Sequence, residues 1–526
     1  MKCKLLIVIL LAITSVSFAQ NKSALWNATT KKNNMVALDS RMQLPENKLF
    51  NLNLVSLKSS LNNAPARTAN SKQSSTILTI PNADGVLEKF SVYENSIMDP
   101  ALAARYPEIK SYIGIGIDNP TATAYFSVSP LGFKSMVLSG DKSAVFIEPI
   151  SADLETYTVY RKADKAQSFT RFECSVIDVA TPQIDVSALR PNADDAVLRT
   201  FRLAMSCTGE YTAYFGGTKA LALAAINNSI TRCNGVFEKD FGARLIIIAN
   251  TDLVIYTNAS TDPYSDAASM SQWNAQLQST LTSIIGEANY DIGHLFGATG
   301  GGGNAGCIGC ICVNGSKGSG ITSPADGIPS GDNFDIDYVA HEIGHQMGAN
   351  HTFTQSNEGT GVQMEPGSGS TIMGYAGITS LDVQPHSDAY FHAISIQQVT
   401  NNIKAKTCSV NIATGNAIPT VGAGLDYTVP KSTPFMLTAS ATDANGDALT
   451  YNWEEMDNQT TAAVPSATKT TGVNFRSYNS TTSTTRYFPR MASVLTGYLL
   501  NTNGMKISIR MWLNIKRSYT SITHNS

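Results

Sequence analysis

One segment near the middle of the chain limits its fold and chemistry more than any other; it runs His341-Glu342-Ile343-Gly344-His345-Gln346-Met347-Gly348-Ala349-Asn350-His351. On a helix, residues four apart lie on one face, so the imidazoles of His341 and His345 could share a cation. Gly348 suits a left-handed helix stop, after which His351 could return as a third ligand. Three neutral imidazoles leave a tetrahedral Zn²⁺ with one open position, as in catalytic zinc sites.

Glu342 follows the first histidine and would project near the open metal position. There its carboxylate could act as a general base, accepting a proton from zinc-activated water. A short HExxH match often arises by chance, but this chain has only seven histidines and three of them lie here in register. The alternative is a surface helix with scattered histidines.

Residues 341–351 resemble the extended zinc motif of the metzincin metallopeptidases, and Thr371-Ile372-Met373-Gly374-Tyr375 resembles their Met-turn. The resemblance is to reprolysin-like (adamalysin-type) secreted bacterial proteases, over about residues 198–410 and more loosely to about 500. It implies an α/β (α+β) catalytic domain with a mixed twisted sheet and an active-site helix. It also implies that Met373 lies beneath the zinc ligands as an apolar support.

Two residues set this chain apart within the superfamily. Many adamalysins have aspartate after the third histidine, where this chain has Thr352. Tyr375 follows Met373 by two residues, and in astacins and serralysins a tyrosine at this spacing reaches the zinc or the transition-state oxyanion. Tyr375 could do either, or it could simply pack within the turn.

The patterning of residues 198–412 agrees with such a catalytic domain, because strands alternate with helices. We expect strands at 198–205, 244–249 and 291–296, and helices at 218–237 and 272–286. By resemblance, an extended protein or peptide substrate would pair with an edge strand near 303–308. His294, in the strand before this edge, is interpreted as a structural residue.

The cysteines suggest both latency and disulfide bonds. Cys174 stands alone upstream of the catalytic region, and this layout resembles metzincins in which a prodomain thiolate occupies the open zinc position. The alternative is an unpaired buried thiol. Six further cysteines lie within the catalytic region, and their even number predicts three disulfides of unspecified pairing: 207, 233, 307, 310, 312 and 408. A metal cluster at 307, 310 and 312 is a less favoured reading.

Residues 1–19 read as a Sec signal peptide. Lys2 and Lys4 precede a short apolar run, and Ser17 and Ala19 place small residues at the −3 and −1 positions. We therefore expect a secreted, extracellular protein. No later stretch reaches the about 18 apolar residues that a transmembrane anchor needs.

Residues 20–197 read as a β-rich propeptide, so we expect the enzyme to be made as a zymogen. Short runs with β-type patterning fall at 76–80, 89–93, 111–117, 122–129, 134–138 and 157–161. Activation would fall between about 187 and 199, where the chain is polar and contains proline. Arg190 and Arg199 are candidate cleavage sites.

Residues 413–500 have the texture of an incomplete β-sandwich and resemble the PKD-like, Ig-like or cadherin-like modules of secreted enzymes. Asp443-Ala-Asn445-Gly-Asp447 could bind Ca²⁺ or could form a turn between strands. Contact with a surface or a carbohydrate through this module is a further hypothesis. Residues 501–526 form a basic tail that continues no earlier pattern, so we expect a truncated or frameshifted C-terminus.

The net charge of the chain and its zinc motif together indicate which class of protein to expect. The 38 basic and 41 acidic residues give a net charge of −3, which offers no electrostatic reason to expect nucleic acid as a partner. We expect a secreted zinc metalloendopeptidase. The alternative is a surface adhesion or binding protein with an inactive metzincin domain, and Glu342 argues against it because degenerate homologues commonly lose that carboxylate. A non-peptidase zinc hydrolase is disfavoured by the Met-turn.

Overall fold

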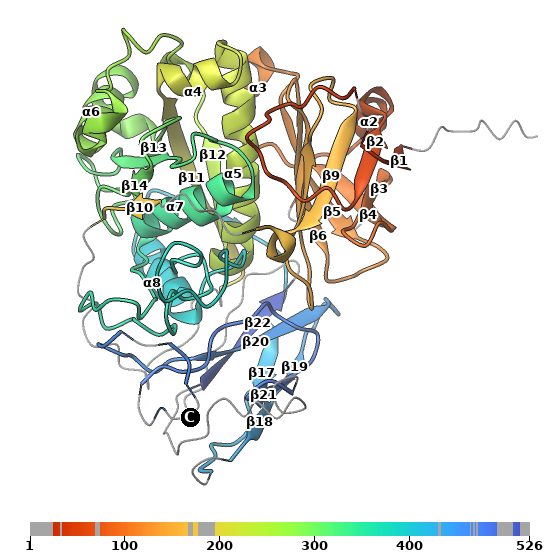
Figure 1. Cartoon of the computed structure of the whole chain (residues 1–526), viewed down its shortest axis with the longest axis vertical. Helices are drawn as coiled ribbons and strands as arrows, with labels where there is room; N and C mark the ends of the chain where they lie inside the picture. Colours follow the sequence, from red (N-terminus) through yellow and green to blue (C-terminus); the bar gives the residue numbers. More distant parts are fainter. Residues whose placement is uncertain are drawn as a thin grey trace, which may run out of the picture.

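The structure is a computed structural model of the whole chain (Figure 1). The residues it describes are 25–31, 34–68, 74–166, 172–176, 195–429, 433–462, 464–466, 469 and 472–491, with the backbone of 509–515. The expected signal peptide, Arg190 and the ends of the basic tail lie outside them. Among the described residues, no helix combines the length and apolar character needed to cross a bilayer.

The first region is a nine-stranded antiparallel sheet in the order β1-β2-β9-β8-β7-β6-β5-β4-β3. Its strands are β1 (Trp26–Thr29), β2 (Leu49–Leu52), β3 (Ile77–Pro81), β4 (Leu87–Glu94), β5 (Lys110–Gly116), β6 (Thr123–Ser129), β7 (Gly132–Leu138), β8 (Val145–Pro149) and β9 (Thr156–Arg161). Two helices accompany it, α2 (Leu54–Leu61) and α3 (Pro100–Arg105). One face buries an aromatic cluster that includes Trp26, Phe126 and Phe133.

The second region is built on a seven-stranded mixed sheet, as the sequence predicts for the catalytic domain. The strand order is β10-β14-β15-β13-β11-β12, with β16 paired to β11. The strands are β10 (Glu173–Cys174), β11 (Val197–Cys207), β12 (Ala243–Ile247), β13 (Ile292–Phe296), β14 (Gly302–Asn304), β15 (Gly320–Ser323) and β16 (Val410–Ala413). The helices are α4 (Gly209–Tyr214), α5 (Lys219–Phe241), α6 (Trp273–Thr280), α7 (Ala340–Met347) and α8 (Ala393–Lys404). Short 3₁₀ or π turns complete the region, and η7 (Asn333–Val339) leads directly into α7.

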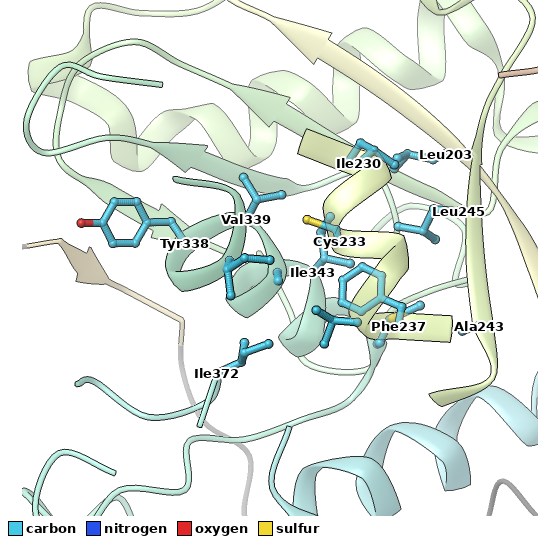
Figure 2. Packing of buried hydrophobic residues seen from close by; sticks show 14 of the residues in the cluster. Leu203, Ile230, Cys233, Phe237, Ala243, Leu245, Tyr338, Val339, Ile343 and Ile372 are labelled. Atoms are coloured by element: carbon cyan, nitrogen blue, oxygen red, sulfur yellow. The ribbon is translucent and has the colours of Figure 1, made fainter. Parts of the chain in front are cut away.

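Helix α5 is the central support of the site. The Oγ1 of Thr218 accepts a hydrogen bond from the backbone N–H of Leu221 at the start of the helix, and Gly242 ends it in the left-handed conformation at φ 62°. Its apolar side chains, including Cys233 and Phe237, pack with Ile343 of α7 (Figure 2). A rigid helix beneath α7 fixes where the side chains of α7 can point.

The opposite face of α5 is polar and is covered by the N-terminal sheet. Arg232 is fully buried; its Nη1 lies 2.5 Å from Glu148 Oε1 of β8 and 2.9 Å from Asp335 Oδ2 of η7. Ser127 Oγ of β6 donates to Asn228 Oδ1 at 3.0 Å. Burial raises the pKa of Glu148, but the charges of Arg232 and Lys134 together lower it below the usual value. The two regions therefore meet through paired charges and hydrogen bonds, and also through apolar side chains such as Tyr125 and Met136, which belong to the same hydrophobic cluster as α5.

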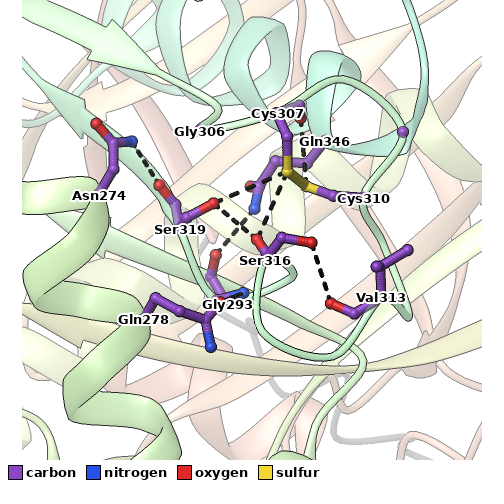
Figure 3. Close-up of a disulfide and its surroundings, with 12 residues drawn as sticks. Asn274, Gln278, Gly293, Gly306, Cys307, Cys310, Val313, Ser316, Ser319 and Gln346 are labelled. Atoms are coloured by element: carbon purple, nitrogen blue, oxygen red, sulfur yellow. Dashed lines mark hydrogen bonds between the residues drawn. A yellow bond between two sulfur atoms is a disulfide. The ribbon is translucent and has the colours of Figure 1, made fainter.

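The cysteines form two disulfides, Cys307–Cys310 (Figure 3) and Cys312–Cys408. The prediction of three disulfides is wrong, because Cys207 and Cys233 are buried free thiols. Cys207 Sγ lies 3.3 Å from Thr212 Oγ1, and Cys233 Sγ donates to the carbonyl of Asp335 at 3.1 Å. The disulfides also rule out the reading of 307, 310 and 312 as a metal cluster.

The C-terminal region contains three two-stranded ladders, β17–β19, β18–β21 and β20–β22. Their strands are β17 (Thr420–Gly422), β18 (Phe435–Thr438), β19 (Ser440–Thr442), β20 (Leu449–Glu455), β21 (Thr485–Phe488) and β22 (Ile509–Ile515). The strand β22 lies within the basic tail, where the sequence indicated none. Asp443 Oδ1 accepts the backbone N–H groups of Asn445 and Asp447, so this acidic segment forms a turn between β19 and β20.

The strand β20 and the chain after it pack onto the second region. Glu454 Oε2 accepts the backbone N–H of Ala393 at 2.7 Å, at the start of α8. Arg476 Nη1 donates to the carbonyl of Val383 at 2.8 Å, and Ser370 Oγ donates to the carbonyl of Ser477 at 3.1 Å. These contacts position β20 and the chain after it against the Met-turn and the start of α8.

Candidate metal centre and active site

The helix α7 is short and carries two of the three motif histidines. It ends at Gly348, whose φ of 128° suits glycine and whose N–H reaches the carbonyls of Gly344 and His345. The positive φ agrees with the expected glycine stop, although it lies outside the left-handed helical region. The chain then reverses direction and brings His351 back toward α7.

The three histidines converge on one point. The Nε2 atoms of His341 and His345 lie 3.1 Å apart, those of His345 and His351 lie 3.1 Å apart, and those of His341 and His351 lie 3.2 Å apart. A tetrahedral zinc with ligands at about 2.0–2.1 Å would separate them by about 3.3 Å. All three side chains are at least 98% buried.

Each Nδ1 atom faces an acceptor, which fixes the tautomers. His341 Nδ1 lies 2.7 Å from the carbonyl of Ile372, and His345 Nδ1 lies 2.7 Å from the carbonyl of Ala349. His351 Nδ1 lies 3.0 Å from Glu358 Oε2. With the proton on each Nδ1, three bare lone pairs face one another at the Nε2 atoms. A shared cation relieves this arrangement, so the residues present fit a bound zinc ion.

Glu342 lies beside this cluster and is fully buried. Its two carboxylate oxygens lack a well-formed hydrogen bond within the described part of the chain. Burial raises the pKa of Glu342 to about 8, and the contact with the Cys174 thiol and then the nearby His351 oppose the rise. A Cβ atom at Gly303 of β14 would overlap this carboxylate, so the strand can lie beside Glu342 only because it has glycine there.

The Met-turn lies under α7. Met373 is fully buried, and a Cβ atom at Gly344 would lie 2.9 Å from its Sδ. The buried carboxylate of Glu365 links the Met-turn to the residue that follows His351. It accepts hydrogen bonds from Thr352 Oγ1 at 2.6 Å and from the backbone N–H of Ser370 at 2.9 Å. Thr352, which departs from the adamalysin pattern, therefore contributes to this link through its hydrogen bond to Glu365.

Tyr375 borders the histidines. Its ring centroid lies 4.8 Å from that of His351 and 5.8 Å from that of His341. Its Oη donates to the backbone carbonyl of Cys174 at 3.4 Å. The ring of Tyr375 therefore packs beside two of the three histidines, and its role at the zinc or at the oxyanion stays a prediction.

The segment 172–176 crosses the site from the N-terminal side. Its strand β10 pairs parallel with β14, which is the edge where the sequence predicts substrate pairing (Figure 1). Cys174 Sγ lies 3.6 Å from His345 Nε2, and the donor atoms of Cys174 and the three histidines all lie within 4.8 Å of one another. Burial, and then the charge of Glu342, raises the pKa of this thiol to about 12.

His294 lies apart from this cluster. Its Nδ1 lies 2.8 Å from Gln346 Oε1 and its Nε2 lies 2.8 Å from Thr322 Oγ1. Burial lowers the pKa of His294 to about 4, so it stays neutral. This agrees with the structural role inferred from the sequence.

Two residues of the site, Glu358 and Glu365, were not found from the sequence, and neither was the contact of Gly303, at the predicted substrate edge, with Glu342. Glu358 and Glu365 lie 7 and 14 residues after His351, and nothing in the local sequence shows that the chain returns them to the site. Gly303 belongs to a run of glycines, and only the fold shows which of them faces Glu342.

A mixed sheet, a short helix with two histidines of a converging triad and a buried glutamate beside them define a metallopeptidase type of domain. Residues 197–406 match the metallo-peptidase family M12B, reprolysin-like, and this part of the chain is a domain of that family. The family implies a zinc-dependent peptidase with protein or peptide substrates. A search of curated proteins finds none that matches the chain. The match ends at residue 406, so the likeness of 413–500 to PKD-like or cadherin-like modules stays a prediction.

Glu358→Gln is expected to weaken zinc binding by about 10- to 100-fold, because the carboxylate orients His351 and raises its basicity. The zinc affinity of the full chain can be measured by competition with a fluorescent chelator. Glu108→Gln, at an exposed carboxylate, serves as the control and should leave the affinity unchanged. Equal affinities in the two variants would contradict a role for Glu358 at the metal site.

Proposed function

We propose that the protein is a secreted zinc endopeptidase, made as a zymogen, whose metal ligands are His341, His345 and His351. The observation that carries the proposal is the convergence of three histidine Nε2 atoms at 3.1–3.2 Å beside the buried carboxylate of Glu342.

The chain's own residues divide the work of hydrolysis. Zinc, when bound, would polarise the peptide carbonyl and lower the pKa of water. Glu342 accepts the proton of the attacking water at its carboxylate and then returns it to the leaving amine. The strand β14 holds the extended substrate by backbone hydrogen bonds, and Tyr375 would donate to the developing oxyanion.

The latency proposal rests on β10. Its pairing with β14 occupies the substrate edge, and Cys174 is the nearest thiol to the histidines. As a thiolate, Cys174 would take the open ligand position and exclude water. Arg199 is buried within β11 and is paired on both sides, so the structure speaks against cleavage at this residue. Cleavage ahead of β11, within the predicted stretch that begins at about residue 187, would then free the second region from the segment that blocks it.

Cys174→Ser in the full chain is expected to raise hydrolysis of unfolded casein at least tenfold over the wild type, because a serine hydroxyl binds zinc far more weakly than a thiolate. A chelator should abolish the activity, and added Zn²⁺ should restore it. Cys207→Ser, at a buried thiol that contacts Thr212 and is not part of the histidine cluster, is the matched control. A folded, zinc-loaded Cys174→Ser protein that cleaves nothing would contradict the peptidase proposal.

The alternative, an adhesion protein with an inactive domain, is not favoured, because the three histidines and Glu342 are all in place. Calcium binding at Asp443 and Asp447, and surface or carbohydrate contact through residues 413–500, are proposals that can be added to the peptidase function without changing it.

A further inference from the structure

The chain between His351 and α8 carries much of the site but has almost no regular structure. All of residues 352–392 are described, and they contain no helix or strand beyond the single bridge between Phe353 and Glu365. The Met-turn and the carboxylate of Glu358, which supports His351, both lie on this stretch. Without a helix or a sheet ladder, its backbone must take its shape from contacts with other segments.

Part of the C-terminal region supplies such contacts, and we name residues 454–462 and 472–479 the clasp. Met456 of the clasp is 4% exposed and belongs to the same hydrophobic cluster as α5 and α7. Asn479 Nδ2 donates to Asp388 Oδ1 at 2.9 Å, and other clasp residues bond to the Met-turn and to the start of α8. The clasp is therefore packed as part of the peptidase region, although the family match ends at residue 406.

Gln363 connects the clasp to the loop that carries Glu358. It is 1% exposed, its backbone N–H donates to Asn458 Oδ1 at 3.1 Å, and its backbone carbonyl accepts the N–H of Gln459 at 3.0 Å. Its side-chain Oε1 accepts the backbone N–H of Glu358 at 3.3 Å, and its Nε2 donates to the carbonyl of Ser356. Gln363 therefore holds the loop with its side chain and the clasp with its backbone.

We propose that Asn458 is a positioning residue for the zinc site, and that the clasp extends the functional peptidase unit beyond the family domain. This inference rests on the proposed peptidase function. The path runs from Asn458 through Gln363 to Glu358, whose Oε2 lies 3.0 Å from His351 Nδ1. Because this carboxylate orients the third histidine and raises its basicity, displacement of the loop weakens the metal site.

Internal contacts of the loop offer a competing explanation. Thr352 Oγ1 bonds to Glu365 and closes the loop at its ends. Gly359 and Gly361 lie within the loop, and a Cβ atom at either position would meet nothing within 4 Å. The middle of the loop therefore has little packing of its own, which favours Gln363 and the clasp as its support.

Asn458→Ala in the full chain tests the proposal, because Asn458 is exposed and its side chain is not part of the core. The zinc affinity, measured by competition with a fluorescent chelator, should fall about three- to tenfold, the effect of one lost hydrogen bond. Asn458→Asp keeps the acceptor oxygen and should restore the wild-type affinity. Asn445→Ala, which removes an acceptor for the N–H of Ala417 within the C-terminal region, is the matched control and should change nothing.

Two further readouts separate positioning from a general loss of stability. In a Glu358→Gln background, Asn458→Ala should lower the zinc affinity by less than about twofold, because the path to His351 is already broken. Hydrogen exchange of the backbone amides of residues 353–363 should speed up about tenfold in Asn458→Ala and should stay slow in Asn458→Asp.

The outcomes separate this inference from the proposed function. Either an unchanged zinc affinity in Asn458→Ala, or the same loss of affinity in the Glu358→Gln background, would overturn the inference and leave the peptidase function standing. A wild-type chain that binds no zinc would contradict the proposed function, and unchanged exchange rates in Asn458→Ala would then overturn the inference separately.

Discussion

Glu342→Gln is expected to reduce peptide hydrolysis by a factor of about 10²–10⁴, the usual contribution of a general base. Glutamine has nearly the same shape as glutamate but cannot accept a proton. Because Glu342 lies beside the histidines and is not among the three converging ligands, the variant should still bind one zinc per chain. Casein hydrolysis, measured in a Cys174→Ser background so that latency does not mask the effect, checks the prediction.

Glu210→Gln in the same background is the matched control, because Glu210 is exposed at the start of α4. It should retain full activity. If Glu342→Gln keeps more than one tenth of the activity with its zinc bound, another group must accept the proton, and the assigned role of Glu342 is wrong.

Glu148→Ala is expected to destabilise the folded chain by about 3–5 kcal/mol, the cost of removing one partner from a buried ion pair. Glu148 pairs with both Arg232 and Lys134, and both oxygens of its carboxylate are buried. The free energy of unfolding can be measured by urea denaturation followed by circular dichroism. Glu155→Ala, at an exposed carboxylate in the same sheet region, should stay within about 0.5 kcal/mol of the wild type.

The same ion pairs make stability depend on pH. The folded pKa of Glu148 lies below its ordinary value of 4.5, so its stabilisation is fully present above that pH and is lost as the pH falls through the folded pKa. The wild type should therefore lose stability below about pH 4.5 more steeply than Glu148→Ala. Parallel pH profiles of the two proteins would contradict a charged Glu148 in the interface.

The sequence predicted the centre of the site because the metal-binding residues lie close together in the chain, at spacings that one helix and one turn determine. The histidines at i and i+4 and the glycine stop depend on one helix and one turn. The helix α7 has the expected form, and Gly348 ends it with a positive φ, although not in the predicted left-handed helical conformation. The α/β core followed from alternating strands and helices, and the mixed sheet followed from the resemblance to the metzincins. In the N-terminal sheet, β1 and β2 span only four residues each, too few to show a period of two.

The rest depends on contacts between distant segments. Nothing in the local sequence distinguishes the buried thiols Cys207 and Cys233 from disulfide-bonded cysteines. The even number of cysteines therefore led to the wrong prediction of three disulfides. Glu358 supports His351 only because a loop returns to it, and Gly303 meets Glu342 only because β14 lies over α7. The polar face of α5 has the pattern of a solvated helix, yet it is buried against the first sheet.

The most direct test of the account is the zinc K-edge X-ray absorption spectrum of the full-length protein, with the zinc content measured on the same sample. We predict one zinc per chain with three nitrogen ligands at about 2.0–2.1 Å and one sulfur at about 2.3 Å. Three nitrogens with a fourth nitrogen or oxygen would support the histidine site but contradict its closure by Cys174. No bound zinc, or zinc without imidazole scattering, would contradict the central claim.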